Sequence, residues 1–85
     1  MPLFVIERQF AERLNFTRDD AATVKLVNDD VGVQWLLSFL SADKKKTYCL
    51  YEAPSAEAIR EAARRAKLPA DVVVEVSEVR PEMFA

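Results

Sequence analysis

Two side chains of this sequence have the chemistry of an acid–base pair. Glu7 lies in an apolar stretch beside Val5 and Ile6, where a partly buried carboxylate can act as a general base. Tyr51 carries a hydroxyl that can donate or accept a proton. We expect Glu7 and Tyr51 to be catalytic only if both side chains reach one accessible pocket. The alternative is that Glu7 forms an ion pair with an arginine or lies at an exposed strand end.

Four aromatic side chains gather in the middle of the sequence, at Trp35, Phe39, Tyr48 and Tyr51. Aromatic side chains can line a pocket for a small apolar or aromatic ligand, and a tyrosine hydroxyl can orient that ligand. The sequence therefore predicts these four residues as ligand-binding residues. The alternative is that they fill the hydrophobic core and an interface between subunits.

Several kinds of chemistry are excluded by residue types that the sequence lacks. It contains no histidine, which rules out a Ser-His-Asp triad and removes the commonest metal ligand. Cys49 has no second cysteine for a disulfide, and we expect it to be a small buried core residue. Gly32 is the single glycine, so no Gly-rich phosphate loop exists. We therefore expect no cofactor and no metal site.

Composition indicates one folded domain, residues 1–85, with 51% hydrophobic and 31% charged residues. The net charge of −2 gives no positive field for nucleic acid. No apolar run approaches the roughly 20 residues that span a bilayer, so we expect no membrane insertion. Without an evident secretory signal and with one unpaired thiol, the chain suits the reducing cytoplasm.

Hydrophobic patterning predicts four strands and two helices. Thr17 and Ser55 are typical N-caps, and Gly32 is a typical helix end, as is the Leu68-Pro69 pair. The strands are expected at residues 3–10, 33–40, 47–53 and 72–79, and the helices at 17–29 and 55–68.

The order β-α-β-β-α-β is the ferredoxin-like motif, an α+β fold with a four-stranded antiparallel sheet and two helices on one face. Alternation along the second strand predicts a face formed by Val33, Trp35, Leu37 and Phe39. The other side of that strand, with Leu36 and Leu40, is also apolar. Because a sheet with two apolar faces needs a second cover, we expect a sheet-to-sheet homodimer of the dimeric α+β barrel type.

Three runs of residues carry a resemblance to a known family. They are Trp-x-x-Ser-Phe at 35–39, Tyr-Cys-x-Tyr-x-Ala-Pro at 48–54 and Arg-Arg-x-x-Leu-Pro-Ala-Asp at 64–71. Together with FVIER at 4–8, they resemble the small bacterial domains of the domain of unknown function 4242 family over nearly the whole chain. The resemblance implies a ferredoxin-like fold and a dimeric barrel. One relative is described as nickel-binding, so the resemblance also suggests nickel.

The same resemblance implies histidines that this chain lacks, because relatives carry histidine where this sequence has Leu37 and Ala62. Nickel(II) favours imidazole nitrogen, so any nickel site here would need glutamates and Cys49 as substitute ligands.

Three hypotheses for the function follow. The first is a small dimeric binding or accessory protein of unknown ligand. The second, by analogy with enzymes of similar fold, is a cofactor-independent isomerase, cyclase or monooxygenase that uses Glu7 and Tyr51. The third is a nickel-binding protein.

Overall fold

The computed structural model describes residues 1–84, and its elements follow the predicted order. Each element begins and ends within about three residues of its predicted bounds. In chain order the elements are β1 (Leu3–Gln9), α1 (Arg18–Val31), β2 (Gln34–Leu40), β3 (Lys46–Glu52), α2 (Ala56–Ala66) and β4 (Val72–Val76). A short 3₁₀ helix, Pro81–Phe84, follows β4.

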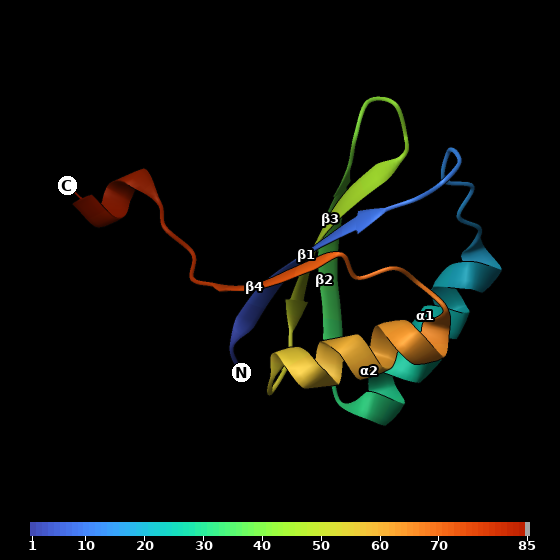
Figure 1. Cartoon of the computed structure of the whole chain (residues 1–85). Coiled ribbons are helices and arrows are strands. Elements are labelled where there is room, and N and C mark those ends of the chain that lie inside the picture. Colours follow the sequence, from blue (N-terminus) through green and yellow to red (C-terminus); the bar gives the residue numbers. More distant parts are fainter. Residues whose placement is uncertain (85) are drawn as a thin grey trace.

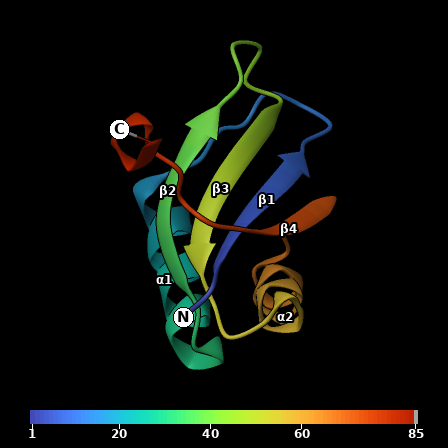
Figure 2. The same cartoon turned by 90° about the vertical axis from the view of Figure 1, so that its left-hand side faces the viewer.

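The four strands form one antiparallel sheet in the order β2-β3-β1-β4. Both helices cover the same face of this sheet (Figure 1), and Figure 2 views the sheet from the opposite side with the helices behind it. This arrangement confirms the predicted α+β, ferredoxin-like fold. Within residues 1–84, neither helix is long and apolar enough to cross a membrane.

Short sequence signals set the ends of both helices. The Thr17 side chain accepts a hydrogen bond from the Asp20 backbone N–H, and the Asp20 carboxylate accepts one from the Thr17 N–H, which is a capping box. Gly32 ends α1 at φ 87°, in the left-handed region that glycine adopts without strain. Ser55 caps α2 by accepting a 3.2 Å hydrogen bond from the Ala58 N–H. All three predicted caps are confirmed.

The hydrophobic core lies between the sheet and the helices. Alternation along β1 points Phe4, Ile6 and Arg8 toward the helices, and all three are buried. Ile6 and Ile59 of α2 are the largest side chains with almost no exposed surface. A charged side chain therefore continues the apolar row that Phe4 and Ile6 begin.

A β-bulge in β2 changes which side chains share a face. Trp35 pairs with Tyr51, whereas the next pair along the strands joins Leu37 to Leu50, so Leu36 is an extra residue. Residues that pair across an antiparallel sheet lie on the same face. Trp35 therefore lies on the helix side with Tyr51, and Leu37 lies on the other side. The prediction that Trp35 and Leu37 share a face is wrong, because the inserted residue breaks the alternation.

The side of the sheet away from the helices, which we call the open face, is apolar and uncovered in the single chain. Its large exposed residues have between 39% and 68% of their surface accessible, and they are Leu37, Phe39, Tyr48, Val72 and Val74. The predicted second apolar face is thus confirmed, whereas its burial by a second subunit stays a prediction. The segment after β4 projects from this side in Figure 1 and crosses in front of the sheet in Figure 2.

Candidate functional site

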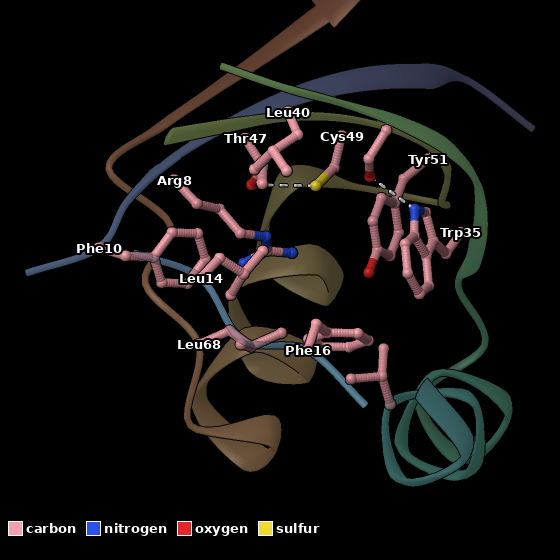
Figure 3. Close-up of a pocket in the computed structure, with 12 residues that line it drawn as sticks. Arg8, Phe10, Leu14, Phe16, Trp35, Leu40, Thr47, Cys49, Tyr51 and Leu68 are labelled. Carbon is pink, nitrogen blue, oxygen red and sulfur yellow. Dashed lines mark hydrogen bonds between the residues drawn. The ribbon is translucent and has the colours of Figure 1, made fainter. Parts of the chain in front are cut away.

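A pocket of about 150 Å³ lies between the helix side of the sheet and the segment that joins β1 to α1. Strands β1, β2 and β3 form one wall, and the joining segment, Val24 of α1 and Leu68 after α2 form the other (Figure 3). Most of the lining is apolar or aromatic. The lining residues are Arg8, Phe10, Leu14, Phe16, Val24, Trp35, Ser38, Leu40, Thr47, Cys49, Tyr51 and Leu68.

The roof of the pocket is the segment 10–17, which two backbone hydrogen bonds tie to the β2–β3 turn. The Phe10 N–H donates to the Lys45 carbonyl at 2.8 Å, and the Leu14 N–H donates to the Lys44 carbonyl at 2.7 Å. Lys44 adopts φ 63°, the left-handed conformation of a tight turn. Since few hydrogen bonds hold this segment, local opening of the roof is easier than opening of the sheet.

Trp35 forms the side wall of the pocket, and the bulge puts it there. Its indole Nε1–H donates a 2.8 Å hydrogen bond to the Ser38 hydroxyl oxygen. Ser38 pairs with Cys49, so it lies on the same side of the sheet. The Phe16 ring meets the Trp35 ring edge to face, with 6.0 Å between ring centroids and an interplanar angle of 87°. Trp35 and Phe16 are each 36% exposed, so this aromatic pair lies at the boundary between the pocket and solvent.

Arg8 is the charged side chain of the pocket, and only 3% of its surface is exposed. Its Nη1 donates a hydrogen bond of 2.5 Å to the Pro69 carbonyl. Its guanidinium carbon lies 5.8 Å from the centroid of the Tyr51 ring, within the range of a cation–π contact. Figure 3 shows the guanidinium in the middle of the pocket. A cation is thus held in a pocket whose lining is mostly apolar or aromatic.

Tyr51 presents its ring and hydroxyl from β3. Burial raises the pKa of the Tyr51 hydroxyl above its usual value, and the hydrogen bond with Asn28 and the nearby Arg8 charge oppose that shift. Asn28 Nδ2 donates to the Tyr51 hydroxyl oxygen at 3.4 Å. The hydroxyl therefore stays protonated at neutral pH and keeps its own proton available for donation.

The structure divides the four aromatic residues predicted to bind a ligand. Trp35 and Tyr51 line the pocket together. Phe39 pairs with Tyr48 on the open face, and both are exposed. The prediction of one site formed by all four is wrong, because the bulge at Leu36 turns Trp35 inward while Phe39 stays outward.

Glu7 and Tyr51 do not converge on one pocket. Glu7 pairs with Tyr48 on the open face, whereas Tyr51 lies on the helix side. The Glu7 carboxylate forms a 3.2 Å ion pair with the Lys46 ammonium, and this contact raises the pKa of Lys46. The predicted acid–base pair is therefore wrong in geometry. Its alternative, an ion pair, is correct in kind, with a lysine in place of the expected arginine.

The described residues do not offer a metal-binding cluster. Among residues 1–84, no three His, Cys, Asp or Glu side chains gather where they could hold an ion. Cys49 is buried, as predicted, and its thiol donates to the Thr47 hydroxyl at 3.5 Å. A carboxylate is also missing from the part of the pocket lining that the structure describes.

Several pocket residues are not predicted by the sequence patterns. Arg8 follows Phe4 and Ile6 at a spacing of two, so a charge on an apolar strand face was the available signal. Phe10, Leu14 and Phe16 precede the first helix with no strand or helix periodicity. Their place over the sheet depends on backbone hydrogen bonds to a distant turn.

The fold defines a class: small ferredoxin-like α+β proteins, here with a pocket between the sheet and the segment that joins β1 to α1. More specifically, the chain belongs to the family described as nickel responsive protein SCO4226-like, whose family model matches residues 4–76. No match was found among curated proteins. The resemblance to the domain of unknown function 4242 family stays a prediction.

The chain is also similar to a solved structure, the crystal structure of SCO4226 from Streptomyces coelicolor A3(2). The two share 26% sequence identity and superpose with a TM-score of 0.76. The match covers 92% of this chain and 99% of the other. This likeness supports the family assignment and agrees with the fold described above.

Proposed function

We propose that this protein is a small-ligand-binding protein and that its pocket holds one apolar molecule about the size of an aromatic ring. The observation that carries the proposal is about 150 Å³ of space under the Phe16–Trp35 pair. Protein interiors are otherwise packed as tightly as organic crystals. Apolar cavities of about 150 Å³ accept benzene-sized molecules. The pocket is thus matched to a ring-sized ligand, and it is too small for a nucleotide or a long lipid.

The roof segment 10–17 supplies the route of entry in this proposal. Phe16 packs on Trp35 by an edge contact, and the segment is fastened to the turn by the Phe10 and Leu14 amides. Displacing Phe16 opens the cavity without breaking the sheet. The strands then act as a rigid wall against which the roof closes over the ligand.

The proposal includes a homodimer in which a second copy covers the open face. Phe39, the most exposed of the large hydrophobic residues of that face, lies there with Leu37 and Tyr48, and neighbouring exposed apolar side chains are typical of an interaction site. A copy of the same sheet offers a surface of the same chemistry, and two-fold pairing is the commonest closed assembly. The pocket lies on the other side of the sheet, so each chain keeps its own site.

Nickel chemistry does not fit the residues of this chain, although the family is described as nickel responsive. The sequence has no histidine, and nickel(II) favours imidazole among protein ligands. Cys49 is buried next to the Arg8 cation with no carboxylate in the described pocket lining. The proposed function therefore involves no metal ion.

Trp35 provides the test, because it is the sole tryptophan and it forms a wall of the pocket. Titrating the protein with toluene is expected to change Trp35 fluorescence in a saturable way. Cys49→Leu adds side-chain volume inside the pocket and is expected to abolish the saturable change. The matched control is Tyr48→Leu, which changes the adjacent residue of the same strand on the open face, and it should bind toluene as the natural sequence does.

A fluorescence response that stays linear up to the solubility limit of toluene contradicts the proposal. So does a saturable response that Cys49→Leu leaves intact, because the ligand would then lie outside the pocket. Circular dichroism of each variant checks that the fold is retained.

A further inference from the structure

Arg8 is a buried cation, and its burial calls for an explanation. Only 3% of its surface is exposed, and it lies on the same strand face as the core residues Phe4 and Ile6. Burying an ion costs far more free energy than burying a neutral polar group, unless the ion is paired. A leucine or methionine at this position would avoid that cost. The buried charge therefore calls for compensating interactions.

The partners of Arg8 within residues 1–84 do not neutralise it. Nη1 donates to the Pro69 carbonyl, and the guanidinium faces the Tyr51 ring. No carboxylate of the described residues lies within 4.0 Å of it. By contrast, Arg64 and Arg65, which are far more exposed, both form ion pairs with acidic side chains. Among residues 1–84, the buried arginine thus has no anionic partner, whereas Arg64 and Arg65 at the surface do.

The other polar groups of the pocket also suit an anion. The hydroxyl oxygens of Tyr51, Ser38 and Thr47 each already accept a hydrogen bond, and the donors are Asn28, Trp35 and Cys49. A hydroxyl that accepts in this way still has its own proton to donate. The pocket consequently offers O–H donors together with the guanidinium N–H donors of Arg8. A carboxylate, which only accepts hydrogen bonds, is complementary to this set.

We propose that the ligand of the pocket is a small apolar carboxylate, with about one aromatic ring under Phe16 and Trp35 and its carboxylate on Arg8. This inference rests on the proposed ligand-binding function and names the chemical class of the ligand. The ring fits a volume of about 150 Å³, and the Arg8 guanidinium lies among the side chains that line that space (Figure 3). Bidentate pairing with a guanidinium orients a carboxylate and adds to its affinity.

A purely structural role for Arg8 makes a different prediction. The hydrogen bond to the Pro69 carbonyl holds the segment after α2 against β1. If that were its whole purpose, the pocket would not distinguish a charged ligand from a neutral one of the same shape. The comparison of benzoate with benzamide separates the two roles, because both have one ring and differ in charge.

Isothermal titration calorimetry of the full chain with benzoate and with benzamide tests the proposal. The natural sequence is expected to bind benzoate roughly 10- to 100-fold more tightly than benzamide, the range for hydrogen bonds to a charged group. Arg8→Met keeps the apolar stem of the side chain and removes the cation. It is expected to erase the preference while benzamide affinity stays within about threefold. The matched control Arg60→Met removes an exposed arginine on α2 and should keep the preference.

The outcomes separate this inference from the function on which it rests. Equal affinity for benzoate and benzamide in the natural sequence overturns the carboxylate assignment and leaves a pocket for neutral ligands. Failure of toluene, benzoate and benzamide alike overturns the ligand-binding function itself. Because the comparison of the two ligands in the natural sequence needs no substitution, a poorly folded Arg8→Met protein does not remove the test.

Discussion

Replacing Phe39 with alanine is expected to weaken the proposed homodimer, because Phe39 is the most exposed of the large hydrophobic residues of the open face. About two-thirds of its surface (68%) remains for a second copy to bury. Full burial of a phenylalanine contributes about 1.5–3 kcal/mol, so burial of the exposed part of Phe39 contributes about 1–2 kcal/mol to association. A two-fold interface buries Phe39 of both copies, so the substitution should cost about 2–4 kcal/mol of association free energy per dimer. The dimer dissociation constant should therefore rise by roughly 30- to 700-fold.

Sedimentation velocity over a dilution series measures this dissociation constant for each variant. The matched control is Leu26→Ala, because Leu26 is 71% exposed but lies on α1, behind the sheet. The Leu26→Ala variant should have the same dimer dissociation constant as the natural sequence. A natural chain that sediments as a monomer, or an equal effect of the two substitutions, would refute the assignment of the open face as the interface.

Three further predictions concern stability, pH and metal. Ile59→Ala, at a core position 1% exposed, should lower the free energy of unfolding by about 2–5 kcal/mol in urea titrations, and a loss below about 1 kcal/mol would contradict the packing described. Burial raises the pKa of Tyr51 above 10.0, so its stabilising contribution is complete below pH 10.0 and is lost as pH rises through the raised value. Urea midpoints should therefore fall less steeply above pH 10.0 in Tyr51→Phe than in the natural sequence, and parallel curves would contradict the assignment. Equilibrium dialysis against Ni²⁺ should detect no saturable uptake, and stoichiometric uptake would show that carboxylates and Cys49 can replace imidazole.

The fold could be predicted because several independent signals agree. The Thr17 and Ser55 caps and the Gly32 helix end each mark a boundary by a local hydrogen bond or by a backbone conformation. Alternation and apolar runs mark the strands between them. Such signals depend on nearby residues alone, so they can be recognised in the sequence without the tertiary structure.

The site could be predicted only in part, because it depends on contacts between distant residues. Trp35, Leu36 and Leu37 are all apolar, so the hydrophobic pattern fits the strand with or without a bulge. That one extra residue decides whether Trp35 joins Tyr51 in the pocket. The sequence shows Arg8 as a charge on an apolar face, but its proposed role depends on the absence of a neighbouring carboxylate among residues 1–84. The sequence order of charges does not specify that absence.

The most direct test of a ligand pocket on the helix side of the sheet is the measurement of intermolecular nuclear Overhauser effects between benzoate and the protein. The aromatic protons of benzoate should show contacts to Trp35 and Phe16, which form the wall and the roof of the pocket. Phe39 and Tyr48 on the open face should show none. Contacts to Phe39 and Tyr48 without contacts to Trp35 and Phe16 would contradict the account, because benzoate would then lie on the uncovered sheet.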